Sequence, residues 1–135
     1  MGTVLYCYTT GDTTNKLADY EYNFEGHVLI LKSIEAKLPR NFAINTPLYL
    51  CCNAVEDSLI IKGSDELPVK ERVLKQLIGG SSFYRWEGDS QHYFDLKHSA
   101  IKDLRLYIID GSGEVVKKDN ILIRCTIELK PKSAL

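Results

Sequence analysis

The sequence lacks several features that would place it in a specialised class of protein. It contains no apolar run of about 18 residues, the length that a membrane-spanning helix needs. Its net charge is only −1, whereas a nucleic-acid-binding domain usually has a strongly basic surface. The first residues show neither the basic nor the apolar segment of a secretory signal, so we expect no classical secretion. We therefore expect a protein that spans no membrane, binds no specific nucleic acid and works in a reducing compartment.

Cysteine is present, but its spacing predicts neither a metal site nor a disulfide framework. No two cysteines are separated as in a C-x-x-C motif, and no histidine stands beside them at zinc-ligand spacing. Without a secretion signal, the simplest interpretation is free thiols that pack as small apolar side chains. We therefore expect no metal and no cofactor, and four free thiols: Cys7, Cys51, Cys52 and Cys125.

The most regular pattern lies near the C-terminal end, where apolar and polar residues alternate over residues 121–130. Residues 104–108 repeat this alternation, and the glycine-containing residues 110–113 between them favour a turn. Alternation with a period of two indicates a strand with one buried and one exposed face. We therefore predict a β-hairpin, and its inward side chains would be Leu104, Leu106, Ile108, Ile123, Cys125 and Ile127.

The rest of the chain shows the same short extended segments, separated by turn residues. A continuous apolar run at residues 28–31 predicts a central strand covered on both faces, and two polar or proline-bounded stretches predict loops over residues 10–15 and 39–47. Further strands are predicted over residues 4–9, 18–24, 27–37, 48–55, 59–61, 83–87 and 92–96. Short strands at this spacing are typical of a β-sandwich or barrel. The sequence predicts an all-β protein: one domain over residues 1–135, a single jelly-roll-like β-sandwich of about eight strands.

Residues 67–78 leave two alternatives open. Apolar residues at helical spacing, Pro68 near the start and two glycines after the end favour a helix. A lone helix in an otherwise all-strand chain would need its own groove, which favours a strand. The resemblance of part of this segment to a known family favours the strand.

No arrangement of residues predicts catalysis. His98 and Ser99 are adjacent, but no glycines of a nucleophile elbow surround them. Glu56, Asp57 and the acidic residues 65–66 are candidates for acid–base pairs, yet acidic residues are common in turns for backbone reasons. We therefore expect that the protein is not an enzyme.

Aromatic residues suggest a surface instead. The chain has eight tyrosines and one tryptophan, and exposed aromatics on a β-sandwich often mark a binding surface. The alternative is that these rings fill the core and the sheet faces. The best candidate for an interaction surface combines two short aromatic segments, and its residues are Tyr84, Arg85, Trp86, Tyr93 and Phe94.

Three blocks of the sequence, residues 47–60, 73–78 and 93–130, resemble motifs of one protein family. They are similar to the penton-like or minor capsid jelly-roll proteins of Polinton and adintovirus-like elements. The chain departs from the family pattern where Tyr93 is followed by Phe94-Asp95 in place of a proline two residues on, and residues 1–46 carry no part of the resemblance. The resemblance implies a jelly roll and a structural role in a virion.

From this resemblance we expect a viral or virus-derived capsid protein that assembles with copies of itself and with other capsid proteins, as a homo-oligomer such as a pentameric ring. Its localisation would be the virion or the interior of a cell. The alternative is a β-sandwich recognition module, such as a viral attachment head or a carbohydrate-binding domain. A third reading is an enzyme whose site is not legible from spacing. The mass in solution distinguishes the first two, because the ring requires several copies.

Overall fold

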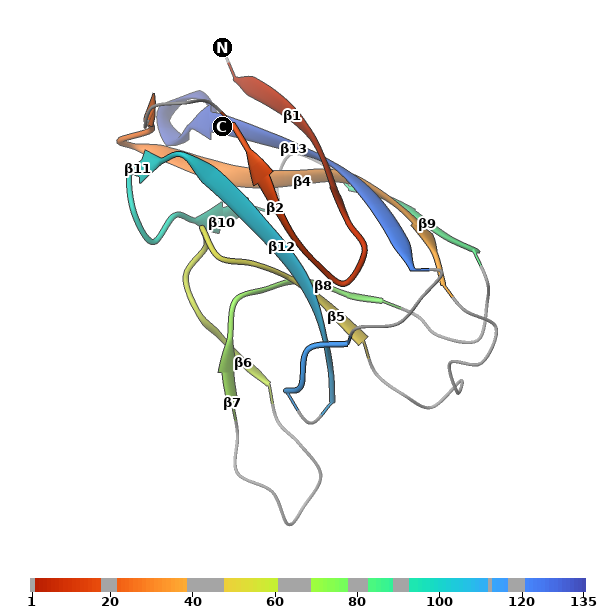
Figure 1. Cartoon of the computed structure of the whole chain (residues 1–135). Coiled ribbons are helices and arrows are strands. Elements are labelled where there is room, and N and C mark those ends of the chain that lie inside the picture. The colour runs from red at the N-terminus through yellow and green to blue at the C-terminus, as the bar shows by residue number, and fades with distance from the viewer. Residues whose placement is uncertain are drawn as a thin grey trace.

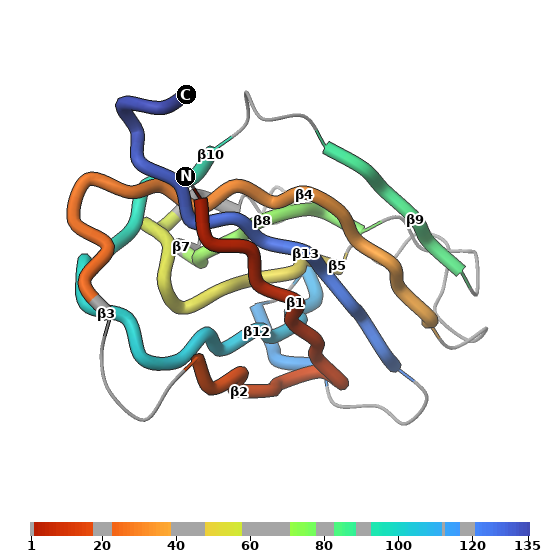
Figure 2. Tube along the Cα trace, turned by 90° about the horizontal axis from the view of Figure 1, so that it is seen from above, coloured from red at the N-terminus to blue at the C-terminus, as the bar shows by residue number. Residues whose placement is uncertain are grey.

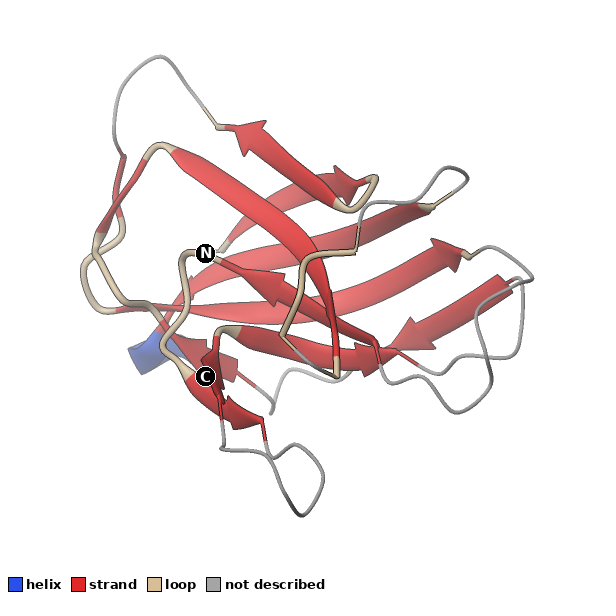
Figure 3. Cartoon of the chain, turned by 60° about the horizontal axis from the view of Figure 1, so that its bottom comes forward, coloured by secondary structure: helices blue, strands red, loops and turns tan. Residues whose placement is uncertain are grey.

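The computed structural model describes residues 2–17, 22–38, 48–60, 69–77, 83–88, 93–111, 113–116 and 121–135. Regular structure in these ranges is almost entirely β-strand, and its only helical segment is a short 3-10 turn, η1 (Lys132–Ala134) (Figure 3). The strands are β1 (Thr3–Thr9), β2 (Asp12–Lys16), β3 (Tyr22–Asn23), β4 (His27–Lys37), β5 (Leu48–Cys52), β6 (Ser58–Ile60), β7 (Val69–Glu71), β8 (Val73–Leu77), β9 (Phe83–Glu87), β10 (Tyr93–Asp95), β11 (Ala100–Ile101), β12 (Asp103–Asp110) and β13 (Leu122–Pro131).

Two antiparallel sheets pack face to face and enclose one main core (Figure 1). The first sheet has the order β1-β13-β4, with β9 and β10 both beside β4. Because β9 pairs with residues 33–37 of β4 and β10 with residues 28–30, the two are successive pieces of one interrupted edge strand. The second sheet has the order β2-β12-β5-β8. The prediction of an all-β sandwich with about eight strand positions is confirmed.

The chain passes between the sheets along the path of a jelly roll. It runs from β1 in the first sheet to β2 in the second, returns to β4, and crosses again to β5 and β8. It then returns to β9 and β10, crosses to β12 and ends with β13 in the first sheet. The first and last strands are therefore antiparallel neighbours, with Thr3 opposite Leu129. Figure 2 shows β9, β4, β13 and β1 side by side in this order.

The predicted hairpin between residues 104–108 and 121–130 is wrong. β12 pairs with β2 and β5, whereas β13 pairs with β1 and β4, so the two strands lie in different sheets. Their predicted inward side chains are buried, but they meet across the core instead of along one ladder: Leu104, Leu106, Ile108, Ile123, Cys125 and Ile127. The alternation of a strand determines which side chains face the core, and it leaves the identity of the neighbouring strand open.

Three further predictions about local structure have clear outcomes. Residues 10–15 do not form only a loop, because β2 begins at Asp12 and pairs with β12. Of the two alternatives for residues 67–78, the strand is correct, since β7 and β8 occupy most of this segment. The central strand is also confirmed: the residues of the apolar run 28–31 are all buried in β4, which has paired strands on both sides. Residues 18–21 and 39–47 lie outside the described residues.

Candidate functional site

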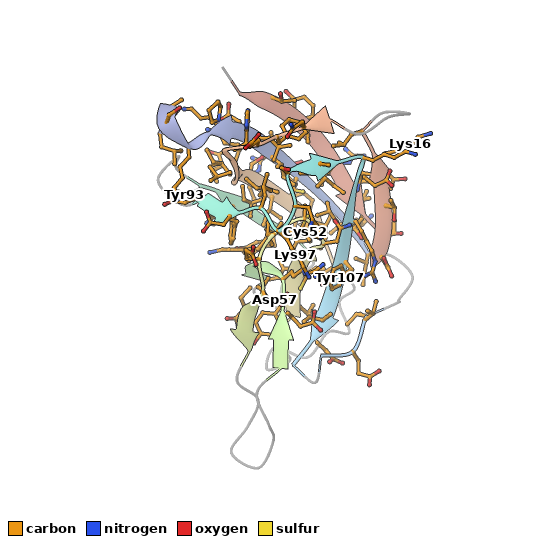
Figure 4. The ribbon with its side chains drawn as sticks, turned by 90° about the vertical axis from the view of Figure 1, so that its left-hand side faces the viewer. Lys16, Cys52, Asp57, Tyr93, Lys97 and Tyr107 are labelled. Atoms are coloured by element: carbon orange, nitrogen blue, oxygen red, sulfur yellow. The ribbon has the colours of Figure 1, made fainter. Side chains whose placement is uncertain are left out.

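The five residues predicted as one interaction surface divide between two faces of the first sheet. Tyr84, Trp86 and Phe94 face inward and are half-buried against the core, because their partners across from them on β4 are core residues. Arg85 and Tyr93 follow the opposite parity and lie on the outer face, with Tyr93 40% exposed. Figure 4 shows Tyr93 at the periphery of the molecule. The five side chains do not form one exposed patch, and their role as an interface stays a prediction.

Trp86 closes one side of the sandwich. Its ring lies 4.9 Å from the Nζ atom of Lys75, which belongs to β8 at the edge of the second sheet. The ring also folds over Gly88, where a Cβ atom would come within 2.2 Å of its Cη2 atom. Because the ring spans the gap between the two sheet edges, Trp86 shields the core at the open side of the sandwich.

The outer face of the first sheet carries a shallow groove of about 700 Å³. Two rows of side chains run across the strands there, as the pairing register requires: Tyr8, Arg124, Glu35 and Arg85 in one row, and Tyr6, Thr126, Ser33 and Glu87 in the other. Small polar side chains lie in the middle of the second row, between a tyrosine and a carboxylate. We name this surface the tyrosine groove and define it by these eight residues.

Tyrosines on β1 form one end of the tyrosine groove. Tyr6 is 84% exposed and Tyr8 is 49% exposed, which are high values for large aromatic side chains. The sequence pattern contained this information, because both tyrosines have the parity opposite to the buried Cys7 within an alternating strand. Neither tyrosine is among the five residues predicted as an interaction surface, although the alternation that predicts the strand also places both rings on its outer face.

Opposite charges are interleaved along the groove. The guanidinium of Arg85 donates a hydrogen bond to the carboxylate of Glu35. This hydrogen bond, with the charge of Arg85 and a smaller effect of Arg124, lowers the pKa of Glu35 below its usual value. Glu35 therefore remains ionised between two arginines, and the groove presents both signs of charge beside aromatic rings. Such a surface suits recognition of a polar, partly aromatic partner.

The thiols are unsuited to nucleophilic chemistry. All four cysteines are buried and free, and Cys7, Cys52 and Cys125 belong to the main core, with Cys52 in the interior in Figure 4. Burial raises the pKa of Cys7 and of Cys52 to about 11, and it also raises the pKa of Cys51 and Cys125. A thiol that stays protonated near neutral pH is a poor nucleophile.

The other candidate residues for catalysis are either exposed, without a hydrogen bond between them, or paired with another side chain. His98 and Ser99 are exposed, and no hydrogen bond joins their side chains to each other. Asp57 pairs with Arg72, whose Nε atom lies 3.1 Å from its carboxylate, while residues 65–66 are outside the described part of the chain. Within the described ranges, no group of three or more potential ligands is placed to hold a metal ion. None of the helical structure described there is long and apolar enough to cross a membrane.

These observations define a class: a two-sheet antiparallel β-sandwich with jelly-roll strand order and an exposed groove on the outer face of one sheet. Comparison of the chain with protein-family models, with curated proteins and with solved structures finds no match in any of the three.

Proposed function

We propose that this chain is a structural subunit that assembles with copies of itself, of the kind that builds viral capsids. The strand order of the two sheets is the observation that carries the proposal, because the jelly roll is a recurrent architecture of capsid subunits. The resemblance of residues 47–60, 73–78 and 93–130 to penton-like or minor capsid proteins of Polinton and adintovirus-like elements also supports it. A pentameric ring is the assembly that this resemblance implies, with other capsid proteins as further partners.

The tyrosine groove offers a surface for such assembly. It combines exposed aromatic rings with arginines and carboxylates in alternation, and a copy of the same chain can place opposite charges against one another. A net charge of −1 keeps the general repulsion between copies small.

Mass in solution tests the proposal. We expect light scattering in the micromolar range to give several times the mass of one chain, 15.3 kDa. The charge reversal Arg124→Glu should lower the assembled mass, because it removes a cation that a carboxylate of another copy can meet and leaves the groove with an excess of negative charge. Lys102→Glu is the matched control, since Lys102 is exposed in the bend between β11 and β12 and does not line the groove. A wild-type protein that stays a single chain at every concentration contradicts the proposal.

A second function, recognition of a glycan or another polar ligand, is favoured by one specific observation. Tyr6 and Tyr8 stand exposed beside a groove whose middle is lined by the small residues Ser33 and Thr126. Aromatic rings beside polar groups are the usual elements of such a binding site. This alternative predicts a monomer that is retained on immobilised glycans, and that Tyr8→Ala abolishes retention while the control Lys102→Ala does not.

A further inference from the structure

Half of the β1 edge is covered and half is open. β1 ends the first sheet on the side opposite β9 (Figure 2). Asn15 of β2 covers the far half: its Oδ1 atom accepts a hydrogen bond from the Tyr8 N–H at 3.1 Å, and its Nδ2 atom donates to the Tyr8 carbonyl at 2.9 Å. We call this pair of bonds the Asn15 clip. It shows that the backbone groups of Tyr8 point away from β13.

The geometry of an antiparallel strand shows which backbone groups of β1 are open. The direction of the backbone N–H and C=O groups alternates from residue to residue, so Val4 and Tyr6 present theirs on the same side as Tyr8. In the described part of the chain, no backbone or side-chain group bonds to Val4 or Tyr6 on that side. Their side chains are 47% and 84% exposed on the outer face. This half of β1 is therefore a strand edge with free donors and acceptors.

The β1 edge differs from the other edges of the two sheets in its charge. Natural sheets protect open edges with charged side chains, because a charge opposes pairing with another strand. The other edge strands each contain at least one charged residue: Asp12 and Lys16 in β2, Lys75 in β8, Arg85 and Glu87 in β9, and Asp95 in β10. β1 contains none over Thr3–Thr9. The protection that the other edges have is absent where the backbone is open.

We propose that the open edge of β1 pairs with the same edge of a second copy of this chain. The pairing is antiparallel about a two-fold axis, so the outward N–H and C=O groups of one strand meet those of the other. Two uncharged strands meet without repulsion of like charges, which a charged edge would suffer against its own copy. The contact joins the five-stranded sheets of two subunits into one continuous sheet. It rests on the proposed function in that it names a two-fold contact between copies, which is distinct from the contacts around a ring.

The Asn15 clip determines the register. Its side chain occupies the space beside Tyr8, so a partner strand fits only along residues 2–6. The two-fold axis then passes beside Val4, which lies opposite Val4 of the partner subunit, and Tyr6 lies opposite Gly2 of the partner subunit. Gly2 suits this position, because the absence of a side chain leaves space for the tyrosine ring on the outer face.

The inner side of the open edge also has room for a neighbour. A cleft of about 360 Å³ lies between β1 and β2, lined by Leu5, Tyr6, Thr14, Asn15, Lys16 and Leu17 among others. The inward side chains of a partner strand would enter this cleft. A contact over five residues is small, so we expect a weak dimer whose formation depends on a high local concentration.

Chemical cross-linking tests the register directly. Val4→Cys places one exposed thiol next to the two-fold axis, and we expect a short bismaleimide to convert this variant into a covalent dimer. The matched control is Gln76→Cys, which places an exposed thiol on the edge strand β8 of the other sheet. The wild type serves as a blank, because its four thiols are buried. We expect cross-linking of Val4→Cys to be faster than that of the control by at least about tenfold. Equal rates in the two variants would overturn the proposal.

Two further variants move the dimer in opposite directions. Val4→Lys should raise the dimer dissociation constant by about tenfold or more, since it places two lysines across the axis, while Val4→Thr should leave it near the wild-type value. Asn15→Ala should lower the dissociation constant, because loss of the Asn15 clip lengthens the open edge. An unchanged constant in Val4→Lys would refute the pairing.

The outcome separates this contact from the proposed function. Cross-linking at Val4 in a protein that never exceeds two copies supports the edge contact and contradicts the capsid-type assembly. A large assembly without cross-linking at Val4 supports the assembly and rejects the edge contact.

Discussion

Thr9 shows how single residues join the two sheets. It is the only polar residue among those described that is fully buried, at 0% exposure. Its hydroxyl donates a hydrogen bond to the Leu106 carbonyl at 2.9 Å and accepts one from the Gly11 N–H at 3.1 Å. Gly11 in turn accepts a hydrogen bond from the N–H of Ile108. The turn that ends β1 in the first sheet is thus attached to β12 in the second.

We expect Thr9→Val to destabilise the protein by about 1–3 kcal/mol, because the change keeps the shape of the side chain but leaves the Leu106 carbonyl without its hydroxyl partner. Urea unfolding measures the change. Thr126→Val is the matched control, since Thr126 lies half-buried on the outer face of β13 and its side chain makes no hydrogen bond within the described part of the chain. Equal effects of the two substitutions would contradict the role assigned to Thr9.

We predict that ionisation of a buried thiol destabilises the folded protein at alkaline pH. Burial raises the pKa of Cys7 from 9.0 to about 11 in the folded protein, so the unfolded chain releases this proton at lower pH than the folded chain. The contribution of Cys7 to the free energy of unfolding is fully present below pH 9 and is lost as the pH rises toward 11. We expect Cys7→Ala to lose less unfolding free energy than the wild type over this interval, by about 1–3 kcal/mol. Chemical unfolding at a series of pH values measures both slopes, and identical slopes would refute the assignment.

At the scale of elements, the sequence predicts what each strand buries but not where each strand lies. Ile123, Cys125 and Ile127 alternate with polar residues, so their inward direction was predictable from a period of two. The strands beside them in the sheet were not predictable in this way. Leu104 and Leu106 show the same alternation, and they face the same core from the other sheet. Sequence proximity and a glycine turn favoured a hairpin, but the jelly-roll path takes the chain across the core at this point.

Two other differences also have physical causes. β2 was predicted as a loop because its residues are polar on both faces, as an edge strand allows, and its pairing with β12 leaves no apolar pattern to detect. In the candidate site, residues 84–86 do not form one surface, because the alternation of β9 turns Arg85 outward and its two aromatic neighbours inward. The same alternation, applied to β1, would have selected Tyr6 and Tyr8 as exposed aromatics.

The position of Trp86 gives a prediction for the β9 edge. We expect Trp86→Ala to destabilise the protein by about 1–3 kcal/mol, less than for a fully buried tryptophan, because the ring is only half-buried against the core. Thermal and urea unfolding measure the loss. Tyr6→Ala is the control, since a ring that is 84% exposed should contribute within about 0.5 kcal/mol. If Trp86→Ala were as neutral as Tyr6→Ala, the ring would not shield the core.

At the scale of the whole molecule, the last strand holds the first sheet together. β13 lies between β1 and β4 and pairs with both along most of its length, while η1 beyond it contains no buried residue. We expect deletion of residues 122–135 to abolish cooperative unfolding, because β1 then loses its only ladder partner within the described chain. Deletion of residues 133–135 is the control and should leave the unfolding transition in place. Circular dichroism during heating distinguishes the two, and a cooperative transition in the longer deletion would contradict this role.

The pairing of the first strand with the last also determines when the molecule can fold. A ribosome makes β1 before every other described strand and β13 after them, so β1 must wait for β13 to emerge before it gains its neighbour in the sheet. Contacts between residues so distant in sequence require closure of a large loop before they contribute any stability, and all-β proteins of this kind refold in about milliseconds to seconds. Until β13 has been made, the uncharged β1 strand has no ladder partner among the described strands of its own chain. On a polysome, where nascent copies stand close together, this unpaired strand is exposed to association with another copy.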